Sequence, residues 1–186
     1  MQDAPLKIRI LLDYSNTISA AATLADPLPS PDPMSVSWVA GKPTEPMMRT
    51  LLDIRLDTCP TSPSLFTRTK TTHRLEYTAA RARMSIPPLP APSNADVLLY
   101  NPSGEITETS IRNVAFWRRA PPQWVTPHAE VGCLPGVMRR WLLEQGRIVE
   151  AQVGELVKDD LVEGEYILTF NGVEGCRIGR IALPSR

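Results

Sequence analysis

Lys70 is the residue whose surroundings most strongly suggest covalent chemistry. It stands in the stretch TRTKTTHRLEY, residues 67–77, where threonines flank it and an amphipathic segment follows. A lysine amine that loses part of its hydration becomes available as a nucleophile and as a proton carrier. A lysine on an open surface is instead an ordinary solvated charge. Other motifs in the sequence are needed to choose between these two interpretations of Lys70.

Three later segments carry further residues that could form a site. They read DVLLYNPSGEITETSIRNVAF at 96–116, WVTPHAEVGCLPGVMRRWLLEQG at 124–146 and EGEYILTFNGVEGCRIGRI at 163–181. The LPGV turn that enters a helix could bring backbone amides close to an anion. Taken singly, each segment has a simpler interpretation: Glu108 as a surface acid, LPGV as a turn into a core helix, and TFNG as a turn between strands. The functional interpretation therefore depends on all four segments occurring together.

Composition excludes several classes of protein. The 186 residues are enough for one large domain or for one and a half small ones, and 42% hydrophobic and 22% charged residues are typical of a globular chain. Twenty basic residues balance twenty acidic ones, so the charge favours neither nucleic acid nor an anionic membrane as a partner. No apolar run approaches the roughly 20 residues of a membrane span, and the first residues do not read as a signal peptide. We therefore expect a cytoplasmic protein.

The cysteine and histidine content argues against a metal site. Cys59, Cys133 and Cys176 are far apart, and the chain has only two histidines. This spacing fits neither a disulfide framework nor a zinc site.

The apolar pattern predicts a mixed α and β chain (α+β) in which strands dominate. It indicates a hairpin over 6–24, and strands at 34–40, 49–58, 96–101, 106–118, 123–127, 148–153, 159–171 and 177–183. Helices are expected over about 72–84 and from about Val137 to Gly146. The proline-rich stretch 26–33 is expected to be an extended linker.

In this order the four segments resemble the fold-type IV pyridoxal-phosphate enzymes, the class IV aminotransferase family. Within it they are most similar to the aminodeoxychorismate lyases, fungal lyase-like members in particular. The resemblance covers about residues 66–181, and the hairpin at 6–24 extends it upstream. It implies the strand-rich C-terminal domain of the class IV aminotransferase or D-amino-acid aminotransferase-like fold.

The resemblance also implies roles for individual residues around pyridoxal 5'-phosphate. Lys70 would bond covalently to the cofactor and move the proton, and the carboxylate of Glu108 would keep the pyridine nitrogen protonated. The cofactor phosphate would be held by a helix N-terminus and by the turn after the last core strand. The residues implied at these two places are Val137, Met138, Asn171 and Gly172.

The sequence departs from the family pattern at several positions. His73 stands where the lyases often have asparagine, and Arg112 stands where small residues usually follow the glutamate. Both are candidates for substrate contacts, although Arg112 could equally be an outward surface arginine. Residues 1–33 are expected to be a remnant hairpin and linker of the family's N-terminal domain, and 34–186 the cofactor-binding domain. The family's phosphate-binding arginine is not expected in this chain.

The activity implied is that of a lyase acting on 4-amino-4-deoxychorismate, which forms 4-aminobenzoate and pyruvate in the folate pathway. A class IV aminotransferase acting on branched-chain or D-amino acids is the alternative, because the same lysine and glutamate serve both reactions. A second alternative is a truncated, non-catalytic family member that acts as a binding module. The expected partners are a small amino-acid-like substrate and a second copy of the chain in a homodimer.

Overall fold

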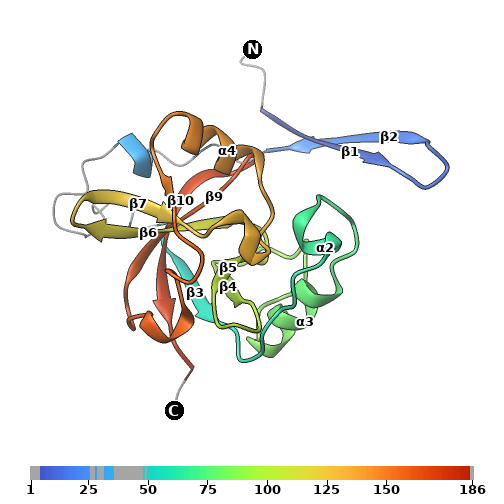
Figure 1. Cartoon of the computed structure of the whole chain (residues 1–186). Coiled ribbons are helices and arrows are strands. Elements are labelled where there is room, and N and C mark those ends of the chain that lie inside the picture. Colours follow the sequence, from blue (N-terminus) through green and yellow to red (C-terminus); the bar gives the residue numbers. More distant parts are fainter. Residues whose placement is uncertain (1–4, 26–27, 29–31, 36–47, 49, 185–186) are drawn as a thin grey trace.

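The fold is an eight-stranded sheet with helices outside it and a separate two-stranded hairpin (Figure 1). The structure is a computed structural model, and it describes residues 5–25, 28, 32–35, 48 and 50–184. Within this part of the chain, no helix is long and apolar enough to span a membrane. The strand-rich α+β class predicted from the sequence is confirmed.

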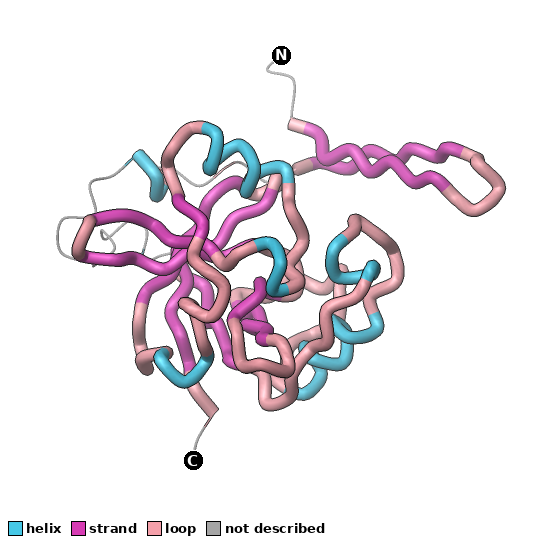
Figure 2. Tube along the Cα trace, in the orientation of Figure 1, coloured by secondary structure: helices cyan, strands magenta, loops and turns pink. Residues whose placement is uncertain are grey.

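The strands follow one another along most of the chain, as Figure 2 shows in magenta. They are β1 (Leu6–Leu12), β2 (Ile18–Leu24), β3 (Leu52–Leu56), β4 (Ala95–Tyr100), β5 (Ile106–Thr109), β6 (Asn113–Arg119), β7 (Pro122–Thr126), β8 (Val149–Glu150), β9 (Tyr166–Asn171) and β10 (Gly175–Ala182). The helices are α2 (Leu65–Arg68), α3 (Leu75–Arg83) and α4 (Val137–Glu144). Three short 3-10 turns are η1 (Pro33–Ser35), η2 (Ala129–Val131) and η3 (Lys158–Asp160).

The large sheet has the strand order β5-β4-β3-β10-β9-β6-β7-β8. Strand β10 lies near its middle, antiparallel to β9 and parallel to β3. Residues 110–112 join the edge strand β5 directly to β6, which stands sixth in the order. Because so short a connection cannot cross a flat sheet, the sheet curls back on itself.

The curl creates one core inside the sheet and two smaller ones outside it. Alternate residues of β4 point to opposite faces, so Leu98 and Tyr100 enter the inner core while Val97 and Leu99 pack against α3. On another part of the outer face, Leu142 of α4 packs against the sheet residues Leu168 and Phe170. This packing fixes α3 against β4 and α4 against β9.

The hairpin of β1 and β2 stands away from the sheet (Figure 1). Its register pairs Leu6 with Leu24 and Leu12 with Ile18, which puts the apolar side chains of both strands on one face. Each of these four side chains is more than half exposed. The predicted hairpin over 6–24 is therefore confirmed, and its apolar face is uncovered in this structure.

Most of the predicted elements are present, with several differences. The strand predicted over 159–171 begins only at Tyr166, since η3 occupies Lys158–Asp160, and the strand predicted over 148–153 is reduced to the two residues of β8. The single strand predicted over 106–118 is wrong, because Ser110–Arg112 turn away from the sheet and divide it into β5 and β6. Helix α2 was not predicted, although Ser64 caps it and Thr67 bonds back to the Ser64 amide. The strand predicted over 34–40 falls largely outside the described residues, and residues 33–35 form η1.

Gly179 marks the closest approach between β10 and β3. A Cβ atom there would lie 2.4 Å from Cγ1 of the fully buried Ile54. We expect Gly179→Ala to lower the free energy of unfolding by about 1–3 kcal/mol, because a β-branched neighbour in a packed sheet cannot yield. Urea denaturation measures this change.

Gly172→Ala is the matched control, because no atom lies within 4 Å of the Cβ that it would add. Its unfolding midpoint should stay close to that of the parent chain. Equal midpoints for both variants would contradict the close packing of β10 on β3.

Candidate cofactor site

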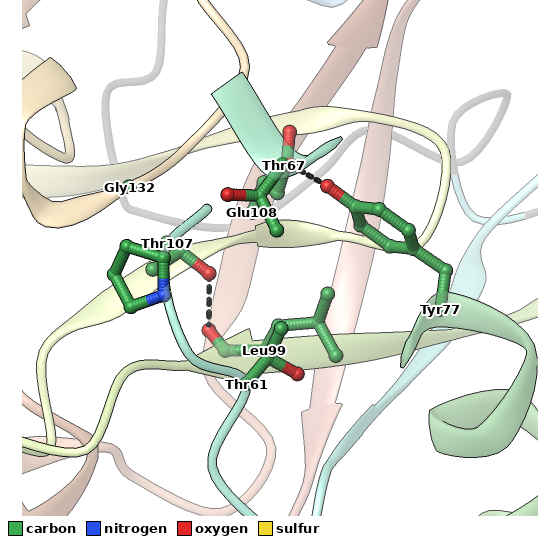
Figure 3. A pocket seen from close by; sticks show the side chains of 8 residues that line it. Thr61, Thr67, Tyr77, Leu99, Thr107, Glu108 and Gly132 are labelled. Carbon is green, nitrogen blue, oxygen red and sulfur yellow. Dashed lines mark hydrogen bonds between the residues drawn. The ribbon is translucent and has the colours of Figure 1, made fainter. Parts of the chain in front are cut away.

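Glu108 is the buried acid at the centre of the candidate site. It lies on β5 and is only 5% exposed, which excludes its interpretation as a surface acid. The Tyr77 hydroxyl donates to Glu108 Oε1 at 2.7 Å, as Figure 3 shows, and Asn113 Nδ2 donates to Oε2 at 3.3 Å. These partners come from α3 and β6, so three elements meet at this carboxylate.

The environment of Glu108 changes its acidity. Burial raises the pKa of this carboxyl from its ordinary value near 4.5 to about 7. The Tyr77 hydroxyl, the Leu134 backbone N–H and the positive charges of Arg74 and Lys70 oppose this rise. A carboxyl poised near neutrality can hold or release a proton under physiological conditions.

Lys70 lies in the connection between α2 and α3, and its side chain is exposed. Its charge lowers the pKa of Glu108, so the structure brings the predicted lysine and the predicted carboxylate into the same neighbourhood. Arg74 reinforces the link, because its guanidinium stacks 4.6 Å from the centre of the Tyr77 ring and donates to the Ser110 carbonyl. The segment after Lys70 is thereby attached to the turn that follows Glu108.

The N-terminus of α4 lies beside Asn113, one of the hydrogen-bond partners of Glu108. Its N-cap is Gly136, which offers no side-chain cap, so the amides of Val137 and Met138 have no partner within the helix. The Val137 side chain is 82% exposed, so the group of this residue that could bind an anion is its backbone amide. A Cβ at Gly136 would lie 2.5 Å from Asn113 Oδ1, so glycine is required for this close approach.

Asn171 is the last residue of β9, and Gly172 follows it in the turn to β10, beside the same end of the sheet. Asn113 pairs with Phe170, which places Asn171 next to the start of β6. The Asn171 side chain accepts hydrogen bonds from the amides of Val173 and Glu174, so its oxygen stabilises the turn. The space beside Gly172 is open.

Arg112 and His73 are placed differently from the other predicted residues. Arg112 is buried, with Nη1 donating to Asp96 Oδ2 at 3.0 Å and Nη2 paired with Glu174. A substrate carboxylate would therefore have to compete with two protein carboxylates for this guanidinium. The His73 ring is half-buried and lies 4.1 Å from the ring of Phe66.

A small recess opens beside Glu108 and Tyr77 (Figure 3). Its volume is about 10 Å³, which is room for about one water molecule. The other residues that line it are Thr61, Pro63, Thr67, Leu99, Thr107 and Gly132. The recess itself holds no more than a single water, which could exchange protons with the buried carboxyl.

Sequence reasoning missed the residues that hold Glu108 in place. Tyr77 could have been noticed as the aromatic residue on the buried face of the predicted helix, and Asn113 as the polar residue that opens the apolar run NVAF. Neither signal indicates which carboxylate such a side chain contacts. The contacts join positions far apart in the chain, such as Tyr77 and Glu108, which are 31 positions apart.

Comparison with known proteins identifies a family and several relatives of this chain. The family model described as amino-transferase class IV matches residues 6–181. The aminodeoxychorismate lyase of Saccharomyces cerevisiae is 37% identical over 140 residues, which cover 69% of this chain and 37% of that protein. The putative aminodeoxychorismate lyase of Schizosaccharomyces pombe is 53% identical over 76 residues, covering 41% and 32% respectively. The chain thus spans about a third of the length of these curated relatives.

Solved structures share the fold. A putative amino-acid aminotransferase from Mesorhizobium loti superimposes with a TM-score of 0.69 at 27% identity, covering 95% of this chain and 73% of that one. The 4-amino-4-deoxychorismate lyase of Pseudomonas aeruginosa gives a TM-score of 0.57 at 16% identity, covering 94% and 58%. The second similarity is informative for the fold alone.

The raised pKa of Glu108 predicts a pH dependence of stability in the cofactor-free chain. Between about pH 4.5 and 7 the folded chain keeps a proton on Glu108 that the unfolded chain has released. The free energy of unfolding should therefore fall as the pH rises through this range, by about 3 kcal/mol from this group. Glu108→Gln should remove that part of the slope in urea titrations at a series of pH values.

Tyr77→Phe provides the companion variant. It removes a hydroxyl that favours the charged carboxylate, so the pH range over which stability falls should extend upwards. A Glu108→Gln chain with the same slope as the parent would show that Glu108 titrates normally in the folded state.

Proposed function

This chain belongs to the amino-transferase class IV family, and we propose that it is a pyridoxal-phosphate-dependent lyase that converts 4-amino-4-deoxychorismate to 4-aminobenzoate and pyruvate. The observation that carries the proposal is a buried carboxyl, Glu108, near the charge of Lys70. The similarity to the two yeast lyases supports the choice of substrate.

The residues present fit the cofactor. Glu108 is a buried acid whose hydrogen-bond donors are all neutral, so it retains a strong attraction for a cationic ring nitrogen. The amides of Val137 and Met138 and the dipole of α4 suit a phosphate, and the open space at Gly172 leaves its backbone accessible. When bound, pyridoxal phosphate supplies an aldehyde that bonds to amines and a ring that accepts electrons.

In this proposal the chain's own residues do the following work. The Lys70 amine holds the cofactor between turnovers, then takes the proton from the substrate carbon that bears the amino group. Loss of that proton and cleavage of the carbon–oxygen bond to the enolpyruvyl group leave an aromatic ring, and pyruvate departs. Glu108 holds the ring nitrogen in its protonated state throughout. His73 is the better placed of the two proposed substrate contacts, because the terminal nitrogens of Arg112 are already paired.

We also propose the domain boundaries, assembly and location expected from the sequence. Residues 1–33 would belong to the family's N-terminal domain and 34–186 would form the cofactor-binding domain. The exposed apolar face of the β1–β2 hairpin supports a homodimer, because such a face gains stability when it is covered. The place of action would be the cytoplasm.

A class IV aminotransferase is the second candidate, supported by the 27% identity to the Mesorhizobium loti protein over most of this chain. Product analysis separates the two reactions. The lyase forms pyruvate and 4-aminobenzoate without a second substrate, whereas an aminotransferase passes the amino group to a 2-oxo acid. A non-catalytic binding module would form neither set of products.

Borohydride trapping tests the role of Lys70. The chain has four lysines, Lys7, Lys42, Lys70 and Lys158, so each can be followed by mass spectrometry after incubation with pyridoxal phosphate and reduction. We expect one pyridoxyl group per chain, on Lys70. Lys70→Arg should abolish the adduct and the lyase activity while the chain remains folded.

Lys158→Arg is the matched control, because Lys158 lies in η3 and pairs with the neighbouring Asp159. It should keep the adduct at Lys70. Labelling spread evenly over the four lysines would exclude the cofactor role and, with it, the proposed activity.

A further inference from the structure

Two uncharged side chains determine where the Glu108 carboxylate lies. Tyr77 reaches one oxygen from α3, and Asn113 reaches the other from the first position of β6. No lysine or arginine forms a salt bridge with Glu108 among the described residues. Its position therefore depends on hydrogen-bond geometry, which is directional, and not on a mobile ion pair.

The side-chain amide of Asn113 also contacts the segment that leads into α4. Its Nδ2 also donates to the Leu134 carbonyl at 2.8 Å, in the turn that leads into α4. The Gly136 amide donates to the same carbonyl at 2.8 Å, and the backbone of Leu134 also lowers the pKa of Glu108. One side-chain amide is thus placed between the buried carboxylate and the turn that presents the first amides of α4.

The N-cap of α4, Gly136, lies in close contact with the Asn113 side-chain amide. The position that a Cβ would take at Gly136 is 2.5 Å from Asn113 Oδ1, so the glycine sits directly on the asparagine. Asparagine satisfies the geometry because its two amide hydrogens can serve two acceptors. Aspartate would lack both hydrogens when ionised and would repel Glu108, and alanine would leave the Leu134 carbonyl with one donor fewer.

We infer that Asn113 is a positioning residue that fixes the distance between the Glu108 carboxylate and the N-terminus of α4. This inference rests on the proposed function, in which Glu108 would hold the ring nitrogen of the cofactor and the N-terminus of α4 would hold its phosphate. A rigid cofactor binds well only where both ends of its site are held at the correct separation. Asn113 contacts neither end of that ligand in this account, and it acts through Glu108 and Leu134.

The chain contains a matched control at Asn101. This residue is also buried, and its Nδ2 donates to Glu105 Oε2 at 2.9 Å and to the Val131 carbonyl at 3.2 Å. It therefore bridges a carboxylate and a loop carbonyl as Asn113 does, but in the β4–β5 connection. Asn101→Asp should disturb folding to a similar degree without affecting Glu108.

The first part of the test uses the cofactor-free chain. NMR titration of carbon-13-labelled glutamate carboxyls follows Glu108 in the parent, Asn113→Asp and Asn101→Asp chains. We expect Asn113→Asp to raise the apparent pKa of Glu108 by about one unit or more and to shift the amide signals of Val137 and Met138. The titration also reports the other groups that act on Glu108, namely Tyr77, Arg74 and Lys70.

The second part measures pyridoxal phosphate binding by absorbance. Asn113→Asp should raise the dissociation constant about tenfold or more, and Asn101→Asp should leave it close to that of the parent. If Asn113→Asp does not fold, Gly136→Ala displaces the same amide from the other side and should change both readouts in the same direction.

The outcomes separate this inference from the proposed function. A parent chain that binds no pyridoxal phosphate would refute the proposed function, while the carboxyl pKa and the α4 amide signals would still decide the role of Asn113. Equal effects of Asn113→Asp and Asn101→Asp on those signals would overturn the inference, whether or not the cofactor binds.

Discussion

The buried carboxylate of Asp96 is the interaction on which the arrangement of the site depends. It is fully buried on β4 and accepts hydrogen bonds from Arg81, Thr109, Ser110 and Arg112. Arg81 belongs to α3, Thr109 and Ser110 follow Glu108, and Arg112 continues to Glu174 in the β9–β10 turn. One residue therefore ties together α3, the β5–β6 turn and, through Arg112, the β9–β10 turn. Removal of one partner from such a buried network is costly because the remaining charges stay uncompensated.

The two buried carboxylates, Asp96 and Glu108, have different hydrogen-bond partners and therefore different roles. Asp96 is surrounded by cationic partners and hydroxyl groups, so its charge is neutralised inside the protein. Glu108 lies two positions before Ser110 and has only neutral hydrogen-bond donors, and burial raises its pKa to about 7. The first arrangement stabilises the fold, and the second leaves an acid that can respond to an incoming cation. The curled sheet makes both possible because it joins β5 to β6 by a three-residue turn in which Ser110 and Arg112 donate to Asp96.

Much of the fold could be predicted from local patterns in the sequence. The hairpin at 6–24, helix α3 and helix α4 follow from apolar periodicity, and the glycine at 146 marks the end of α4. The break between β5 and β6 could not be predicted, because Ser110 and Arg112 leave the strand direction to reach Asp96, which is 14 and 16 positions away. The expectation that Arg112 contacts substrate had the same weakness, since its partner Glu174 is 62 positions away. Local patterns identify which residues could act, and only the tertiary contacts show which of them are already occupied.

Hydrogen exchange of an Asp96→Asn chain tests the central role of this carboxylate most directly. Asp57→Asn is the matched comparison, because Asp57 is also buried but, among the described residues, its side chain contacts only Arg83, at 2.6 Å, and the nearby amides of Thr58 and Cys59. The account predicts that Asp96→Asn accelerates exchange of the amides at 109–113 and 172–175, while Asp57→Asn accelerates only those near residues 57–59 and the end of α3. Unchanged protection at 109–113 and 172–175 in the Asp96→Asn chain would show that the site segments are held in place by other contacts, and would contradict this account.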